Sequence, residues 1–138
     1  MANKVLKDAR VFINAVDLSD HVRQVTLNYK AELQDDTAMG DSGRSRLPGL
    51  LDWSADIEFY QDYASGKVDA TLFPLIGAAA FAVRISSDNT AAISATNPEY
   101  QGNAVLESYP PVTGTIGENM MAPIKLMGVG VLTRDTTP

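Results

Sequence analysis

The feature that most constrains the possible folds of this chain is a long polar stretch between two segments in which apolar and polar residues alternate. Residues 32–49, ELQDDTAMGDSGRSRLPG, are rich in Asp, Ser, Gly and Arg and contain few apolar side chains. This composition predicts an exposed loop rather than a helix or a strand. Loops of this length without secondary structure are uncommon in compact domains, and they usually mark either function or disorder.

Both flanks of the polar stretch have the two-residue period of half-buried strands. Apolar residues alternate with polar ones on each side: Val25, Leu27 and Tyr29 before the stretch, and Trp53, Ala55, Ile57 and Phe59 after it. Successive side chains of a strand point to opposite faces, so each run predicts one buried and one wet face. The sequence therefore predicts a hairpin that carries an oversized polar tip.

The rest of the chain predicts further strands and one helix. Alternation indicates strands at residues 11–13, 81–85, 103–109 and 123–133, and the glycines of the last strand suggest a bulge or a close neighbour. Apolar residues at helical spacing predict a helix within residues 64–76, and Pro74 predicts that it ends near Phe73. The run DLSDHV predicts a helical turn capped by Asp17 or Ser19. This order favours a mainly β fold with one helix, an antiparallel β-sandwich or open barrel flanked by an α-helix.

Size and charge limit the classes of function. The 138 residues predict a single domain, with an N-terminal arm at 1–8, a long assembly loop at 31–49 and a C-terminal tail at 135–138. A net charge of -6 argues against a partner held by phosphate neutralisation, and the chain contains no Cys for a disulfide or a thiolate nucleophile. No apolar run approaches the length of a membrane span, so we expect none.

The motifs that suggest chemistry are incomplete. GDSG at residues 40–43 is similar to the nucleophile loop of chymotrypsin-like proteases, but Arg44 replaces the next glycine and the chain is too short for two barrels. His21 has no neighbouring His or Cys, and the acidic residues near Asp41 lack the spacing of a calcium loop. Phosphate-binding glycine motifs are absent from the sequence. We therefore expect no enzyme, no metal site and no cofactor.

Several segments in order resemble the small tail tube (major tail) proteins of long-tailed bacteriophages and prophages. They are the DLSDHV turn, the loop from TAMGD to RLPGL, the WSADIEF strand and the later runs GKVDATLFPLIG, NPEYQGNAVLESYPPVTGTIGE and IKLMGVGVLTR. The resemblance implies a sandwich of antiparallel strands with one helix, assembled as stacked hexameric rings into a hollow tube that conducts phage DNA. It implies a virion protein made in the bacterial cytoplasm, whose partners are its own copies, the tape measure, terminator and baseplate proteins, and DNA that passes without sequence-specific binding.

Two sets of residues are candidates for these roles. The long loop is expected to order against neighbouring subunits, and charged pairs between subunits are expected there. Its candidate interface residues are Asp35, Asp36, Met39, Asp41, Arg44, Arg46 and Leu47. An acidic bore would repel the phosphate backbone, so that DNA slides. The candidate lumen-facing residues are Gln24, Asn28, Asp56 and Glu58.

Two other classes remain open from the sequence. One is another phage structural protein built on a similar sandwich, such as a tail terminator, a neck protein or a capsid decoration protein. The other is a β-sandwich that binds a small ligand or a carbohydrate, which requires exposed aromatic side chains. Trp53 is the one Trp, and its place in an alternating apolar run favours a core position.

Overall fold

The computed structural model describes residues 5–90 and 92–137. Its elements are β1 (Arg10–Ile13), β2 (Val16–Asp17), η1 (Ser19–His21), β3 (Val22–Asp35), β4 (Arg46–Tyr60), α1 (Val68–Leu72), η2 (Phe73–Leu75), β5 (Phe81–Ser86), β6 (Glu99–Ser108) and β7 (Met121–Asp135). The strands form one antiparallel sheet in the order β2-β1-β5-β6-β7-β4-β3. The expected mainly β fold with one short helix is confirmed.

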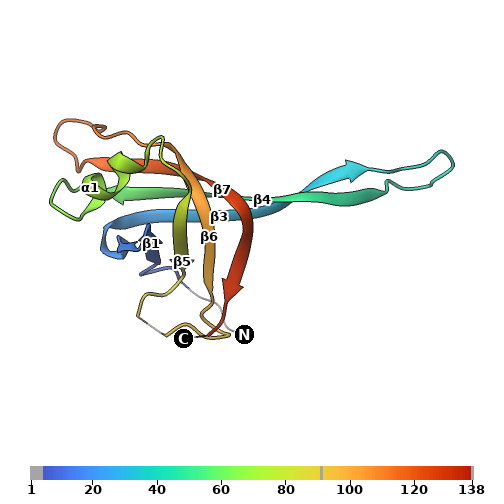
Figure 1. The fold of residues 1–138 in the computed structure, drawn as a ribbon, viewed down its shortest axis with the longest axis horizontal. Coiled ribbons are helices and arrows are strands. Elements are labelled where there is room, and N and C mark those ends of the chain that lie inside the picture. The colour runs from blue at the N-terminus through green and yellow to red at the C-terminus, as the bar shows by residue number, and fades with distance from the viewer. Residues whose placement is uncertain (1–4, 91, 138) are drawn as a thin grey trace.

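The sheet curls so that its two parts share one hydrophobic core. Apolar residues of β1, β5 and β6 pack in the same buried cluster as those of β4 and β7. The alternation in β4 decides which side chains enter this core: Ala55, Ile57 and Phe59 are buried, whereas Asp56 is exposed. Val68 and Leu72 of α1 join the cluster, and α1 lies at the end of the molecule opposite the β3–β4 hairpin (Figure 1).

Trp53 lies in the core, as its alternating run predicted. Its side chain is 1% exposed. The indole packs against the backbone of Gly102 in β6 and Gly128 in β7, where a Cβ would lie 2.8 Å and 2.4 Å from ring atoms. The close neighbour expected for the glycines of the last strand is thus the indole ring. No exposed Trp is left to form a carbohydrate platform.

The hairpin corrects the loop expected at residues 32–49. β3 continues to Asp35 and β4 begins at Arg46, so that these two residues pair and only residues 36–45 connect the strands. Backbone hydrogen bonds between antiparallel strands need no apolar side chains, which explains why composition missed the strand ends. The expected exposure is confirmed for residues 32–50 throughout. The hairpin projects far beyond the body of the molecule (Figure 1).

Other boundaries differ for local reasons. The helix expected within residues 64–76 begins only at Val68, and it ends at Leu72 as Pro74 predicted. β6 begins at Glu99, earlier than expected, and continues through a bulge next to Gly102. Within DLSDHV the expected turn is η1, but its N-cap is Leu18, without a side-chain cap bond, rather than Asp17 or Ser19. The Ser19 amide does donate to the Asp17 carboxylate over 2.9 Å.

The chain ends are more structured than expected where they are described. The Asp8 carbonyl oxygen accepts a 2.7 Å hydrogen bond from the Asn89 amide, although Asp8 was assigned to the N-terminal arm. Asp135, assigned to the C-terminal tail, is the last residue of β7 and pairs with Glu99. The expected N-terminal arm includes residues 1–4 and the expected C-terminal tail includes residue 138, and these residues lie outside the described part of the chain.

Across residues 5–90 and 92–137, no helix has the length and apolar character needed to cross a bilayer. In the same part of the chain, no three His, Asp or Glu side chains gather in a way that would hold a metal ion.

Candidate functional site

The projecting part of the β3–β4 hairpin, residues 30–52, is here called the arm. It carries large apolar side chains that no described part of the body covers: Leu33 (59% exposed), Met39 (104%), Leu47 (55%), Leu50 (80%) and Leu51 (47%). A two-stranded ribbon without a packing partner is marginal in water, and clustered exposed apolar residues usually mark an interaction surface. The arm is therefore suited to pack against another molecule.

The tip of the arm has a turn held by its own hydrogen bonds. The Asp36 amide donates to the Ser45 carbonyl oxygen over 2.9 Å, and the Ser45 amide donates to the Thr37 hydroxyl over 2.7 Å. The Asp41 carboxylate accepts from the Ala38 amide over 2.8 Å. Such side-chain bonds to the backbone are the usual way in which Asp and Thr shape turns. Asp41, a candidate interface residue, thus shapes the tip.

The charged residues of the tip are only partly available to a neighbour. Arg44 Nη1 lies 3.0 Å from Asp35 Oδ2 of the same chain, so this pair, which we expected between subunits, forms within one copy. Hydrogen bonds from the side chain and amide of Thr37 lower the pKa of Asp35, and Arg44 adds to this effect. Within residues 5–90 and 92–137, Asp36 and Arg46 have no ion-pair partner.

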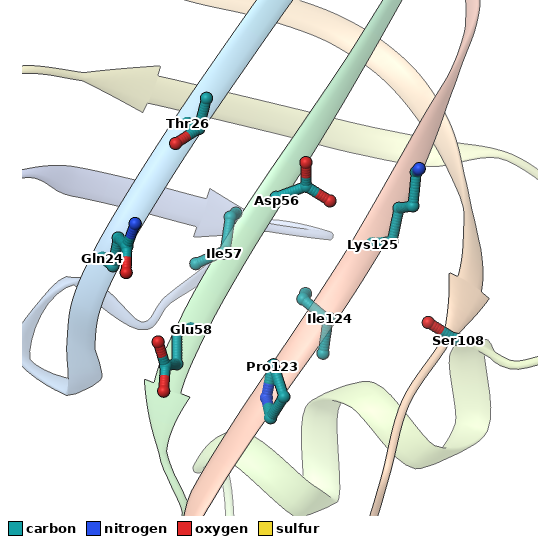
Figure 2. A pocket seen from close by; sticks show the side chains of 9 residues that line it. All are labelled: Gln24, Thr26, Asp56, Ile57, Glu58, Ser108, Pro123, Ile124 and Lys125. Carbon is teal, nitrogen blue, oxygen red and sulfur yellow. The ribbon is translucent and has the colours of Figure 1, made fainter.

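The four candidate lumen-facing residues share one face of the sheet, opposite the core. Gln24 pairs with Glu58 and Asn28 with Ser54 across β3 and β4, while Asp56 pairs with Thr26. Directly opposite residues of an antiparallel pair point to the same side. Figure 2 shows Gln24, Asp56 and Glu58 on this side, around a shallow groove. The alternation of the sequence predicted this common face, here called the polar face.

The polar face also carries two cations that sequence reasoning missed. Lys125 of β7 lies in register with Asp56 and lines the same groove (Figure 2). Arg23 Nη1 lies 3.0 Å from Glu58 Oε2. Two carboxylates thus face two cations, so this surface is not the net acidic lining we expected. Lys125 alternates with buried Ile124 and Leu126, but periodicity alone does not tell which strand neighbours β4.

His21 joins η1 to the segment that follows β4. Its Nδ1 lies 2.7 Å from Asp20 Oδ1, and its Nε2 lies 2.8 Å from Asp62 Oδ2. The Ala64 amide and then His21 lower the pKa of Asp62 by hydrogen bonding. These contacts place a carboxylate at each ring nitrogen and position a surface turn.

Comparison with known proteins supports the fold at low sequence identity. No protein-family model matches the chain, and no curated protein matches its sequence. Solved structures of several assemblies match over nearly the whole chain, including the following three. One is the gene transfer agent (GTA) particle, with a chain of its native virion (TM-score 0.73, 14% identity, covering 96% of this chain and 98% of that one). A chain of the tail of the empty GTA particle, which has C6 symmetry, matches with TM-score 0.68 and 13% identity over 96% and 98%.

The other two assemblies are a phage tail and a contractile system. A chain of the SPP1 tail tube matches with TM-score 0.70 and 11% identity, covering 94% of this chain and 77% of that one. A chain from the sheath/tube terminator of the extracellular contractile injection system PVC matches with TM-score 0.70 and 16% identity, covering 98% of both. At this low sequence identity, the matches establish the fold of the chain. The chain has the phage tail tube fold, as the resemblance in its sequence predicted.

Proposed function

We propose that this protein is a structural subunit of a phage-type tail and that its copies assemble into hexameric rings stacked as a hollow tube. The observation that carries the proposal is the arm, whose exposed leucines have no partner in the body. The tail tube fold supports it, and the matching GTA tail has C6 symmetry. In this proposal the protein belongs to the tail of the virion, next to tape measure, terminator and baseplate proteins.

The two ends of the sheet support closure into a ring. β3 and β2 are the outermost strands, so each has one edge that no other described strand covers. Exposed strand edges carry unpaired amides and carbonyl groups, which promote association unless they are satisfied. Neighbouring subunits in a closed ring satisfy such edges without open-ended aggregation in the plane of the ring.

The polar face is the proposed lining of the bore. Gln24, Asn28, Asp56 and Glu58 remain the proposed lumen-facing residues, and Lys125 and Arg23 are added to them. Because anions and cations are balanced there, the lining offers no cluster of cations to hold phosphates by counterion release. DNA passing through the bore is thus expected to slide without sequence-specific binding.

The test is negative-stain electron microscopy of the purified protein over a concentration series. Tubes of constant diameter that lengthen with concentration are the expected result, because each added ring offers the same surface as the one before. A protein that stays monomeric at the highest concentration contradicts the proposal.

A second candidate is a tail terminator, favoured by the match to a chain of the PVC sheath/tube terminator structure over 98% of both chains. A terminator acts at one end of a tube, so it is expected to stop at a single ring. The same concentration series separates the two candidates, because single rings that never stack support the terminator.

A further inference from the structure

An apolar groove opens on the core side of β3. Leu6, from the segment before β1, lies at the groove, which holds about 370 Å³. The apolar strand residues that line it are Val25, Leu27, Tyr29, Ile85, Tyr100 and Leu132. These residues come from β3, β5, β6 and β7, so the groove lies where the curled sheet leaves its core incompletely covered. Val25, Leu27 and Leu132 are only partly buried against the core, and Tyr29 is 47% exposed. An uncovered apolar surface of this kind indicates a binding partner.

The arm of the same copy does not reach this groove. The arm is the direct continuation of β3 and β4, and it runs away from the body (Figure 1). Leu51 pairs with Ala31, and two residues earlier in β3 Tyr29 pairs with Trp53, so that Leu51 lies on the same face of the hairpin as the groove. Tyr29 and Leu51 are each 47% exposed, so within residues 5–90 and 92–137 this face stays open from the groove onto the arm. An arm that enters the groove must come from a second copy.

The charges beside the groove and on the arm are complementary. Arg134 pairs with Tyr100 and lies two residues after Leu132, so it shares the face of the groove. Within residues 5–90 and 92–137 its guanidinium has no ion-pair partner. The arm carries more carboxylates than cations: Glu32, Asp35, Asp36, Asp41 and Asp52 against Lys30, Arg44 and Arg46. An acidic, leucine-rich ribbon therefore fits an apolar groove with a free cation at its rim.

We propose that the arm of one copy packs its exposed leucines into the β3 groove of another copy, with Arg134 facing the carboxylates of the arm. This inference rests on the proposed tube, and it names the surface that receives the arm. Arm and groove are different surfaces, so the contact is heterologous, and each copy can give one arm and receive one.

The test uses the absence of Cys in the chain, which makes any engineered thiol unique. Leu51→Cys places a thiol on the face of the arm that continues the groove, at a side chain that is 47% exposed, and Ser87→Cys places one at the exposed rim of the groove. The two single variants are mixed, assembled and oxidised, so that a dimer with one chain of each variant must join two copies. The control replaces Ser87→Cys by Thr115→Cys, another exposed position, in the loop between β6 and β7.

The expected result is tubes in which the link between positions 51 and 87 exceeds the control link between 51 and 115 by about tenfold or more, because docking raises the effective concentration of the two thiols. Tubes without this excess overturn the docking and leave the proposed function standing. If unmodified protein forms no tubes, the proposed function fails and the docking fails with it. Should Leu51→Cys itself prevent assembly of tubes that the unmodified protein forms, Leu33→Cys, on the same face of the arm, takes its place, and the same two outcomes decide.

Discussion

At the scale of single residues, the contact between Trp53 and two glycines shapes the body of the protein. The indole occupies the space that side chains would fill at Gly102 and Gly128, and its Nε1 has no hydrogen-bond partner among the described residues. An unpaired buried N–H costs free energy, so the tight packing of the ring has to offset that cost. The packing of the indole ring, rather than a hydrogen bond of its N–H group, therefore explains why positions 53, 102 and 128 hold Trp and Gly.

Gly128→Ala tests this packing. The new Cβ would meet indole atoms at 2.4 Å, so the ring or strand β7 must move. We expect a loss of about 1–3 kcal/mol in the free energy of unfolding, the usual cost of overpacking. Urea denaturation followed by fluorescence of the single Trp measures it. Gly43→Ala is the control, because a Cβ there meets nothing within 4 Å, and equal stability of the two variants would contradict the argument.

Tyr109→Phe tests the bond that holds α1 to the strands. The Tyr109 hydroxyl donates to Asp69 Oδ1 over 2.7 Å and accepts from Gln61 Nε2 over 2.9 Å. We expect a loss of roughly 0.5–1.5 kcal/mol in the free energy of unfolding, measured by urea denaturation. Tyr60→Phe, at a residue that is 40% exposed, should change little. Similar losses in both variants would show that the hydroxyl of Tyr109 has no special role.

The same Tyr109 contact gives a dependence on pH. Burial and then the Asp69 hydrogen bond raise the pKa of Tyr109 to about 12. A raised pKa stabilises the fold fully below the unfolded value of about 10, and this contribution is lost as the pH rises through the folded value. The stability difference between the wild type and Tyr109→Phe should therefore shrink above pH 10.

At the scale of elements, the hairpin separates what periodicity predicts from what it misses. Alternation in β3 and β4 predicted the hairpin, the core position of Trp53 and the common face of Asp56 and Glu58. It missed the strand ends near Asp35 and Arg46, because backbone pairing there leaves no apolar pattern. It also missed Lys125 beside Asp56, since strand order depends on contacts between segments distant in sequence.

Shortening the arm tests it as the element of assembly. Replacing residues 36–45 by Asn-Gly, the residues favoured in a tight hairpin turn, should leave a folded monomer that forms no tubes. Circular dichroism checks the fold and negative-stain microscopy the tubes. A second variant keeps the length of the tip but carries Met39→Ser and Arg44→Ser. Comparing the two variants separates the effect of the length of the arm from the effect of its side chains. Normal tubes from the Asn-Gly variant would show that the tip is dispensable.

At the scale of the whole molecule, three carboxylates with lowered pKa values each add a small contribution to stability toward acid. Hydrogen bonds from Thr37 lower the pKa of Asp35, those from Ala64 and His21 that of Asp62, and those from Thr137 that of Asp135. These groups lie at the tip of the arm, after β4 and at the end of β7. Each lowered pKa contributes stability above the unfolded value of about 3.9, and the contribution is lost as the pH falls through the folded value.

We therefore expect the far-ultraviolet circular dichroism signal to stay constant from pH 7 to about 5 and to change only below about pH 4, where the unfolded state begins to bind more protons. The three groups are exposed, so each contribution is small. A transition centred between pH 5 and 6 would contradict this expectation, because these carboxylates do not titrate there.

The shape of the molecule has a consequence for how a filament of it would stop growing. The arm extends from one end of the molecule and α1 lies at the other, so the two ends are structurally different (Figure 1). In a stack built from such subunits, each added subunit exposes the same binding surface as the subunit before it. The structure of the subunit therefore does not limit the number of subunits in the stack. Final length would then have to be imposed from outside, by a ruler or a plug of different composition.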